Sequence, residues 1–280
     1  MYSSCFLLDF AGFQPYIIQI FLFRKDKIMW EFFYGSYSIA EIGVLCLAAV
    51  LIGVNKTGVP GLGMIPVLLL ADFFEPREST GLQLVMLGMA DILAVIYYRR
   101  QADWKIVLRL MPWALLGIGL GILALKFIAD DTMKPVLAWT ILFMVAFSYV
   151  AKYIKNADKM PDHWAFSAFF GMLAGLTTHV ANAAGPVMAI YLLSMKLEKK
   201  AYIGSAAWYF LILNWLKIPI FAYEGRITLS SIKADVTMIP LLIAGAALGI
   251  VLLHKLPQKR FEQIVQGLAA LGALKMLIWP

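Results

Sequence analysis

Long apolar runs separated by short polar stretches make up most of the chain from residue 36 onward. Runs of about 20 apolar residues are typical of helices that cross a bilayer. The runs are continuous rather than alternating, so they do not indicate a membrane barrel. We therefore predict an all-α, polytopic membrane protein. Its ten apolar segments are residues 36–54, 59–72, 79–98, 107–128, 133–154, 163–180, 183–195, 201–222, 235–253 and 260–279.

Two of these segments are too short to cross the bilayer by themselves. Residues 59–72 and 183–195 supply only about a dozen apolar residues each. Both follow stretches that a regular helix tolerates poorly, because residues 55–61 contain two glycines and a proline and residues 177–182 are mostly polar. We expect a helix broken near the middle of the membrane at each of these two places.

The distribution of lysine and arginine favours ten crossings. If every segment crosses, one side receives more than twice as many of these residues as the other, leaving residues 1–35 aside. If the two short segments are re-entrant loops, this bias disappears, although cytoplasmic loops normally carry the positive excess. We expect ten crossings with both termini outside. The alternative is an eight-span protein with two re-entrant hairpins.

The two halves of the chain show matching positions. Placing Gly53 on Gly175 also places Gly63 on Gly185, and the two short apolar segments then coincide. With small shifts, the further matches are Asp91 with Asn214, Pro112 with Pro240, Gly117 with Gly245 and Gly121 with Gly249. Five segments per half would insert the halves in opposite orientations, as in many secondary transporters. We predict inverted repeats at residues 36–155 and 160–280, which together form one transmembrane domain.

The paired breaks are the strongest indication of a binding site. An interrupted helix exposes backbone groups that survive in the membrane only against protein or a watery cavity. Half-helix N-termini favour anions. Hydrogen-bond donors and one cation, with no carboxylate in either break, favour an oxyanion over a cation or a metal. The candidate substrate-binding residues are Lys56, Thr57, Gly58, Gly61 and Gly63 in the first break and Thr177, Thr178, His179, Asn182 and Gly185 in the second.

Each polar candidate also has a structural interpretation. Lys56 can extend to the lipid headgroups, and Thr177 and Thr178 can bond back to helix carbonyls. His179 can be a buried histidine with its bonds satisfied. Asn182 can cap the helix that begins near residue 183, which is compatible with a role in binding.

Three further polar residues lie inside predicted spans: Asp91, Asn214 and Lys217. An ionisable residue inside the membrane indicates function by default, because its burial is expensive. Asp91 can carry a coupling proton or form a structural ion pair with Lys217. The sequence does not choose between these two roles.

Residues 1–35 form an N-terminal extension without the features of a signal peptide, because the basic cluster at 24–27 follows its apolar stretch. The extension is either an interfacial segment or the result of a misassigned start, with Met29 as the alternative. The net charge of +7 lies in short clusters between apolar segments. That pattern sets orientation in a membrane and does not indicate a nucleic-acid partner.

At the two breaks the sequence resembles the sulfite exporter TauE/SafE family. Residues 56–66 look like the first copy of the family's glycine-rich motif, which is followed by a proline. Residues 175–186 look like the second copy, in the form of one subgroup, and residues 214–219 are similar to the same subgroup. Many members have glycines at the positions of Ala183 and Ala184. The resemblance implies export of sulfite or organosulfonates across the bacterial inner membrane.

These features favour transport of a small anion by alternating access over other functions. Among enzyme signatures, HExxH, GxSxG and paired intramembrane aspartates are absent from the sequence, and residues 58–63 lack the ending of a phosphate-binding loop. We expect no enzyme activity and no cofactor, with a gradient of the substrate, a proton or a cation as the energy source. An anion channel or a membrane scaffold is the alternative, and the oligomeric state stays open.

Overall fold

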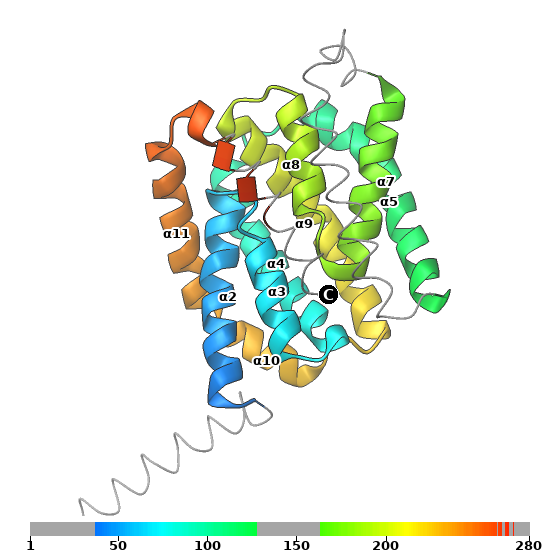
Figure 1. Cartoon of the computed structure of the whole chain (residues 1–280), viewed down its shortest axis with the longest axis vertical. Helices are drawn as coiled ribbons and strands as arrows, with labels where there is room; N and C mark the ends of the chain where they lie inside the picture. Colours follow the sequence, from blue (N-terminus) through cyan, green and yellow to red (C-terminus); the bar gives the residue numbers. More distant parts are fainter. Residues whose placement is uncertain (1–36, 128–162, 262, 265–266, 269–270, 272–280) are drawn as a thin grey trace, which may run out of the picture.

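The computed structural model describes residues 37–127, 163–261, 263–264, 267–268 and 271 of the 280-residue chain. All regular elements among these residues are helices (Figure 1). They are α2 (Ile39–Thr57), α3 (Met64–Phe73), α4 (Pro76–Tyr98), α5 (Trp104–Phe127), α7 (Trp164–Ala181), α8 (Gly185–Ser194), α9 (Lys199–Tyr223), α10 (Leu229–Thr237) and α11 (Ile239–Lys255).

The predicted helical membrane fold is confirmed. Five described helices are long and apolar enough to cross a bilayer, namely α2, α4, α5, α7 and α9, and a bent pair, α10 and α11, would make six. The two short segments form the short apolar helices α3 and α8. The predicted segment 133–154 and most of 260–279 lie outside the described residues.

The predicted segment 235–253 corresponds to helix α11, and a short helix, α10, precedes it. Helices α10 and α11 are bent by 50° at the break between them. A capping box of Thr228 and Ser231 starts α10 upstream of the apolar run. Pro240 lies in the first turn of α11, where its missing N–H favours the start of a helix rather than its continuation.

Helices α2 and α3 form a hairpin around the first break. The ring of Tyr37, just before α2, lies 5.8 Å from that of Phe74, just after α3, and its hydroxyl donates to Glu78 at 2.9 Å. Burial, and then the Glu78 carboxylate, raise the pKa of Tyr37. The other end of α2 lies beside the far end of α4, where Tyr98 donates to the Thr57 carbonyl. Residues 58–73 therefore run back along the length of α2.

Helices α7 and α8 form a second hairpin. The hydroxyl groups of Ser167, near the start of α7, and Tyr191, near the end of α8, are 2.9 Å apart. The short helix again ends beside the start of the long one. Ten crossings require each short helix to end at the membrane face where the preceding long helix begins. A re-entrant loop would instead return to the face where the long helix ends. The number of crossings of the bilayer itself stays a prediction.

Glycines bring two pairs of helices into backbone contact. A Cβ on Gly53 would meet the backbone of α11, and one on Gly245 would meet the backbone of α2. In the second pair, a Cβ on Gly175 would fall on the backbone of α5, and one on Gly117 on the backbone of α7. Small residues allow such close approach between membrane helices. Figure 1 shows α2 beside α11 and α5 beside α7, with α4 and α9 between the pairs.

These contacts give a structural reason for the glycine matches. Gly53 and Gly175, which align with each other, are both on the first long helix of their half. Gly117 and Gly245 are on the helices that pack against them. Each pair therefore takes one helix from residues 36–155 and one from 160–280. The inverted repeat itself stays a prediction, and these contacts support it.

Candidate functional site

The first break is shaped by glycine and by one asparagine. Helix α2 ends at Thr57, and Gly61 has a φ of 101°, which side chains disfavour. The backbone N–H of Gly63 donates to Asn55 Oδ1 at 2.8 Å. The last turn of α2 thereby holds the start of α3 in place.

Asn182 forms the second break. It ends α7 in the left-handed conformation, with a φ of 52°, which asparagine tolerates better than most residues. The prediction that it caps the following helix is therefore wrong. Its amide nitrogen donates to the Thr80 carbonyl of α4 at 2.8 Å. The first turn of α8 begins at Gly185 and Pro186 and has no side-chain cap.

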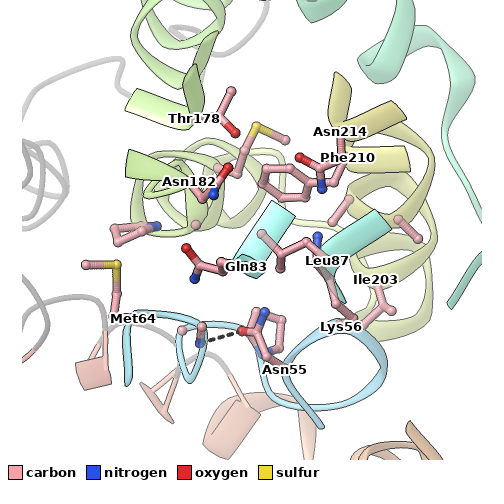
Figure 2. A pocket seen from close by; sticks show the side chains of 18 of the residues that line it. Asn55, Lys56, Met64, Gln83, Leu87, Thr178, Asn182, Ile203, Phe210 and Asn214 are labelled. Atoms are coloured by element: carbon pink, nitrogen blue, oxygen red, sulfur yellow. Dashed lines mark hydrogen bonds between the residues drawn. The ribbon is translucent and has the colours of Figure 1, made fainter. Parts of the chain in front are cut away.

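The two breaks and the central helices α4 and α9 enclose one cavity (Figure 2). The space open to the centre of a water molecule is about 60 Å³, which is room for a few waters or one small anion. Its lining residues are Asn55, Lys56, Pro60, Gly61, Gly63, Met64, Gln83, Leu87, Thr178, Asn182, Gly185, Pro186, Met188, Tyr202, Ile203, Ala206, Ala207, Phe210 and Asn214.

Lys56 forms an ion pair within the protein and does not extend to the headgroups. Its ammonium lies 2.6 Å from Asp91 Oδ1, and the two side chains are 8% and 0% exposed. It also lies 4.3 Å from the centre of the Phe210 ring, where cation–π attraction adds to the pair. The interpretation of Lys56 as a headgroup anchor is therefore wrong.

Asp91 has partners other than the one predicted. Besides Lys56, it accepts from Asn214 Nδ2 through Oδ2 at 2.6 Å, so it joins α2, α4 and α9 at the centre of the bundle. The structure therefore contradicts the expected ion pair between Asp91 and Lys217.

Lys217 is fully buried and turned toward the second break. Its ammonium donates to the Thr178 carbonyl at 2.9 Å, to the Thr178 hydroxyl at 2.8 Å and to Asn182 Oδ1 at 2.8 Å. All three acceptors are neutral. Thr178 and Asn182 line the cavity, so Lys217 acts on it through them.

The cavity brings together only some of the predicted binding residues. Lys56, Gly61, Gly63, Thr178, Asn182, Gly185 and Asn214 line it. Asp91 and Lys217 lie directly behind this lining, in contact with it. Thr57, Gly58, Thr177 and His179 do not line it.

Three of the excluded residues serve helix packing. Thr57 donates to carbonyls of its own helix and of α11, and a Cβ on Gly58 would fall on the backbone of Gly249. Thr177 bonds back to the Leu173 carbonyl at 2.8 Å. Gly58 is thus small because α11 approaches it, not because a ligand does.

His179 points away from the cavity. Its buried ring packs edge-on against Phe221 at 5.4 Å, and Nε2 lies 3.4 Å from Glu224 Oε1. Glu224 Oε2 in turn lies 2.8 Å from Arg226 Nε in an ion pair. His179 is therefore buried outside the cavity, but neither of its ring nitrogens has a hydrogen-bond partner among the described residues, so the interpretation of a histidine with its bonds satisfied is wrong.

Asn55 and Gln83 line the cavity, and the sequence analysis did not single them out. Asn55 comes directly before Lys56 and was treated only as part of the break. Gln83 is 2% exposed and lies inside the apolar segment 79–98. A buried amide within a predicted span is a signal of the same kind that identified Asn214.

The comparisons with known proteins point to one family. No curated protein and no solved structure matches the chain. A family model for the sulfite exporter TauE/SafE proteins matches residues 45–276. That match spans both helix breaks, the central pair α4 and α9 and the cavity between them. The chain therefore belongs to the sulfite exporter TauE/SafE family.

Proposed function

We propose that this protein is a secondary transporter that exports a small sulfur oxyanion, sulfite or an organosulfonate, across the bacterial inner membrane. The cavity between the two helix breaks is the observation that carries the proposal. Broken helices that meet in one cavity are typical of transporter binding sites. Family membership supports transport of this class of anion and not an enzymatic role.

The cavity wall suits an oxyanion because donors outnumber acceptors on it. Lys56 supplies a positive charge. The Asn55 oxygen is used by Gly63, so its amide nitrogen remains to donate. The Thr178 oxygen accepts from Lys217, so its hydroxyl proton is likewise available. The uncapped N-terminus of α8 adds partial positive charge at the same wall.

Transport would proceed by alternating access about this cavity. Its wall combines residues from 36–155 with residues from 160–280, so relative movement of the surrounding helices would change the site itself. Asp91 is the candidate carrier of a coupling proton, because it holds Lys56 through an ion pair.

Counterflow in proteoliposomes tests the proposal. Vesicles loaded with unlabelled sulfite should transiently accumulate labelled sulfite from outside, and sulfate, thiosulfate, sulfoacetate and taurine can be compared as internal anions. A transporter gives this overshoot, whereas an anion channel dissipates the gradient without it. The absence of exchange with every one of these anions would remove the proposed function.

Lys56→Ala should abolish counterflow because it removes the cation from the cavity wall and leaves Asp91 unpaired. A buried charge left in this way costs about 3–5 kcal/mol, so insertion and folding are checked by size-exclusion chromatography. The matched control is Lys105→Ala, which removes an exposed lysine. Unchanged counterflow in a folded Lys56→Ala protein would take Lys56 out of the site.

A further inference from the structure

The buried charges around the cavity do not cancel. Among the residues that the structure describes, the charged side chains at the cavity wall or in direct contact with it are Lys56, Asp91 and Lys217. Their sum decides which ligand charge this part of the site can hold. Uncompensated charge is expensive in a low-dielectric interior. A ligand that brings the sum to zero therefore binds best.

Lys56 and Asp91 together contribute no net charge. Their contact distance of 2.6 Å makes them one unit. Whether the proton resides on the amine or on the carboxylate, the total for the pair is zero. Asn214 donates to the carboxylate and is itself neutral.

In its ammonium form Lys217 contributes one positive charge. A neutral amine carries two N–H bonds and an ammonium three. Lys217 has three acceptors within 2.9 Å, and all three are carbonyl or hydroxyl oxygens. The ammonium form satisfies every one, and no carboxylate is among them.

Among the described residues, His179, Glu224 and Arg226 are the other groups near the second break that carry or can gain a positive or negative charge at neutral pH. None of them lines the cavity. Glu224 forms an ion pair with Arg226 at 2.8 Å and lies 3.4 Å from Nε2 of His179, so the Arg226 charge already balances its negative charge. The cavity therefore faces a net charge of +1.

We infer that the site selects singly charged tetrahedral or pyramidal oxyanions, such as hydrogen sulfite or an alkylsulfonate, and rejects dianions such as sulfate. This inference rests on the proposed function and adds the charge class of the substrate. A monoanion brings the buried total to zero, whereas a dianion leaves one negative charge without a partner. Lys217 sets this selectivity through Thr178 and Asn182.

The test compares two competitors of nearly equal size, methanesulfonate and sulfate, against labelled sulfite counterflow at fixed pH and ionic strength. In the wild-type protein, methanesulfonate should compete at least roughly tenfold better than sulfate, because a full buried charge corresponds to more than one factor of ten in affinity. Equal or weaker competition by methanesulfonate overturns the inference while the proposed function stands. Absence of any sulfite exchange instead removes the proposed function.

Two variants alter the buried charge in a controlled way. Asp91→Asn raises the sum to +2 and should move the competition ratio toward sulfate by roughly tenfold or more. The double variant Lys56→Gln with Asp91→Asn returns the sum to +1 and should restore the preference for methanesulfonate. A ratio that stays the same in Asp91→Asn contradicts the inference. If either variant fails to fold, the competition ratio between methanesulfonate and sulfate in the wild-type protein still decides whether the inference stands.

Discussion

The two helix breaks hold a lysine ammonium at corresponding places but obtain it from different helices. The first break carries its own cation, Lys56, which a carboxylate neutralises. The second break has Thr178 at the matching position and receives the ammonium of Lys217 from α9. The carboxylate Asp91 matches Asn214, so the second break has no counter-charge of its own. Because the carboxylate neutralises the lysine only at the first break, the net positive charge of the site comes from Lys217 at the second break.

The comparison predicts that the second break is more sensitive to loss of charge than the first. Lys217→Gln keeps a donor for Thr178 and Asn182 but removes the uncompensated charge, so counterflow should fall at least roughly tenfold. The double variant Lys56→Gln with Asp91→Asn keeps the net charge and should lose less exchange activity than Lys217→Gln. The comparison fails if the double variant loses more activity than Lys217→Gln, with both proteins shown to be folded.

Asp91→Asn tests the first break, because it removes the carboxylate that the second break lacks. If Asp91 carries a coupling proton, an imposed pH gradient should no longer drive accumulation, while counterflow without a gradient continues. Both are measured on the same vesicles. Gradient-driven accumulation that persists in the variant would assign Asp91 a purely structural role.

Glycine substitutions test whether the two packing interfaces are equivalent. Gly53→Ala and Gly175→Ala place a methyl group against backbone in the α2–α11 and α5–α7 pairs, and each should destabilise by about 1–3 kcal/mol. Gly185→Ala meets nothing within 4 Å and should stay within about 0.5 kcal/mol. Thermal unfolding in detergent measures all three. If only one of the two variants, Gly53→Ala or Gly175→Ala, lowers the unfolding temperature, the two packing interfaces are not equivalent.

Single cysteines at Glu78 and Lys199 report on topology, and counterflow by each variant checks that the protein still folds. These positions follow the α2–α3 hairpin and the α7–α8 hairpin respectively. Ten crossings require them to react with a membrane-impermeant thiol reagent from opposite faces. Cys5 and Cys46 are first replaced by serine or alanine. Labelling of both positions from one face would favour the eight-span arrangement.

The apolar helices and the places where two of them break could be predicted from the sequence. Bilayer thickness sets the length of an apolar span, and glycine, proline and clustered polar residues mark its interruption, so both signals are local. The cation in the first break was likewise visible as Lys56. The glycine matches indicated a repeat, although their cause, close packing of α2 on α11 and of α5 on α7, requires the structure.

Side-chain partners could not be predicted, because they depend on helix rotation and on depth. Lys56 lies in the last turn of α2, and a turn of the helix decides whether it meets lipid, Phe210 or Asp91. His179 follows Thr178 directly, yet the step of about 100° per residue in a helix takes it out of the cavity. The short helix α10 before the segment 235–253 was not predicted, because its mixture of polar and apolar residues does not form an apolar run.

The cross-packing of the two halves has a consequence for the origin of the chain. A free-standing polypeptide equivalent to residues 36–155 would leave the glycine faces of α2 and α5 bare, because their partners α11 and α7 come from the other half. A second copy inserted upside down would cover both faces. The predicted inverted repeat would make the contacts within this chain equivalent to those of an antiparallel homodimer, and duplication and fusion of its gene would have made that assembly permanent.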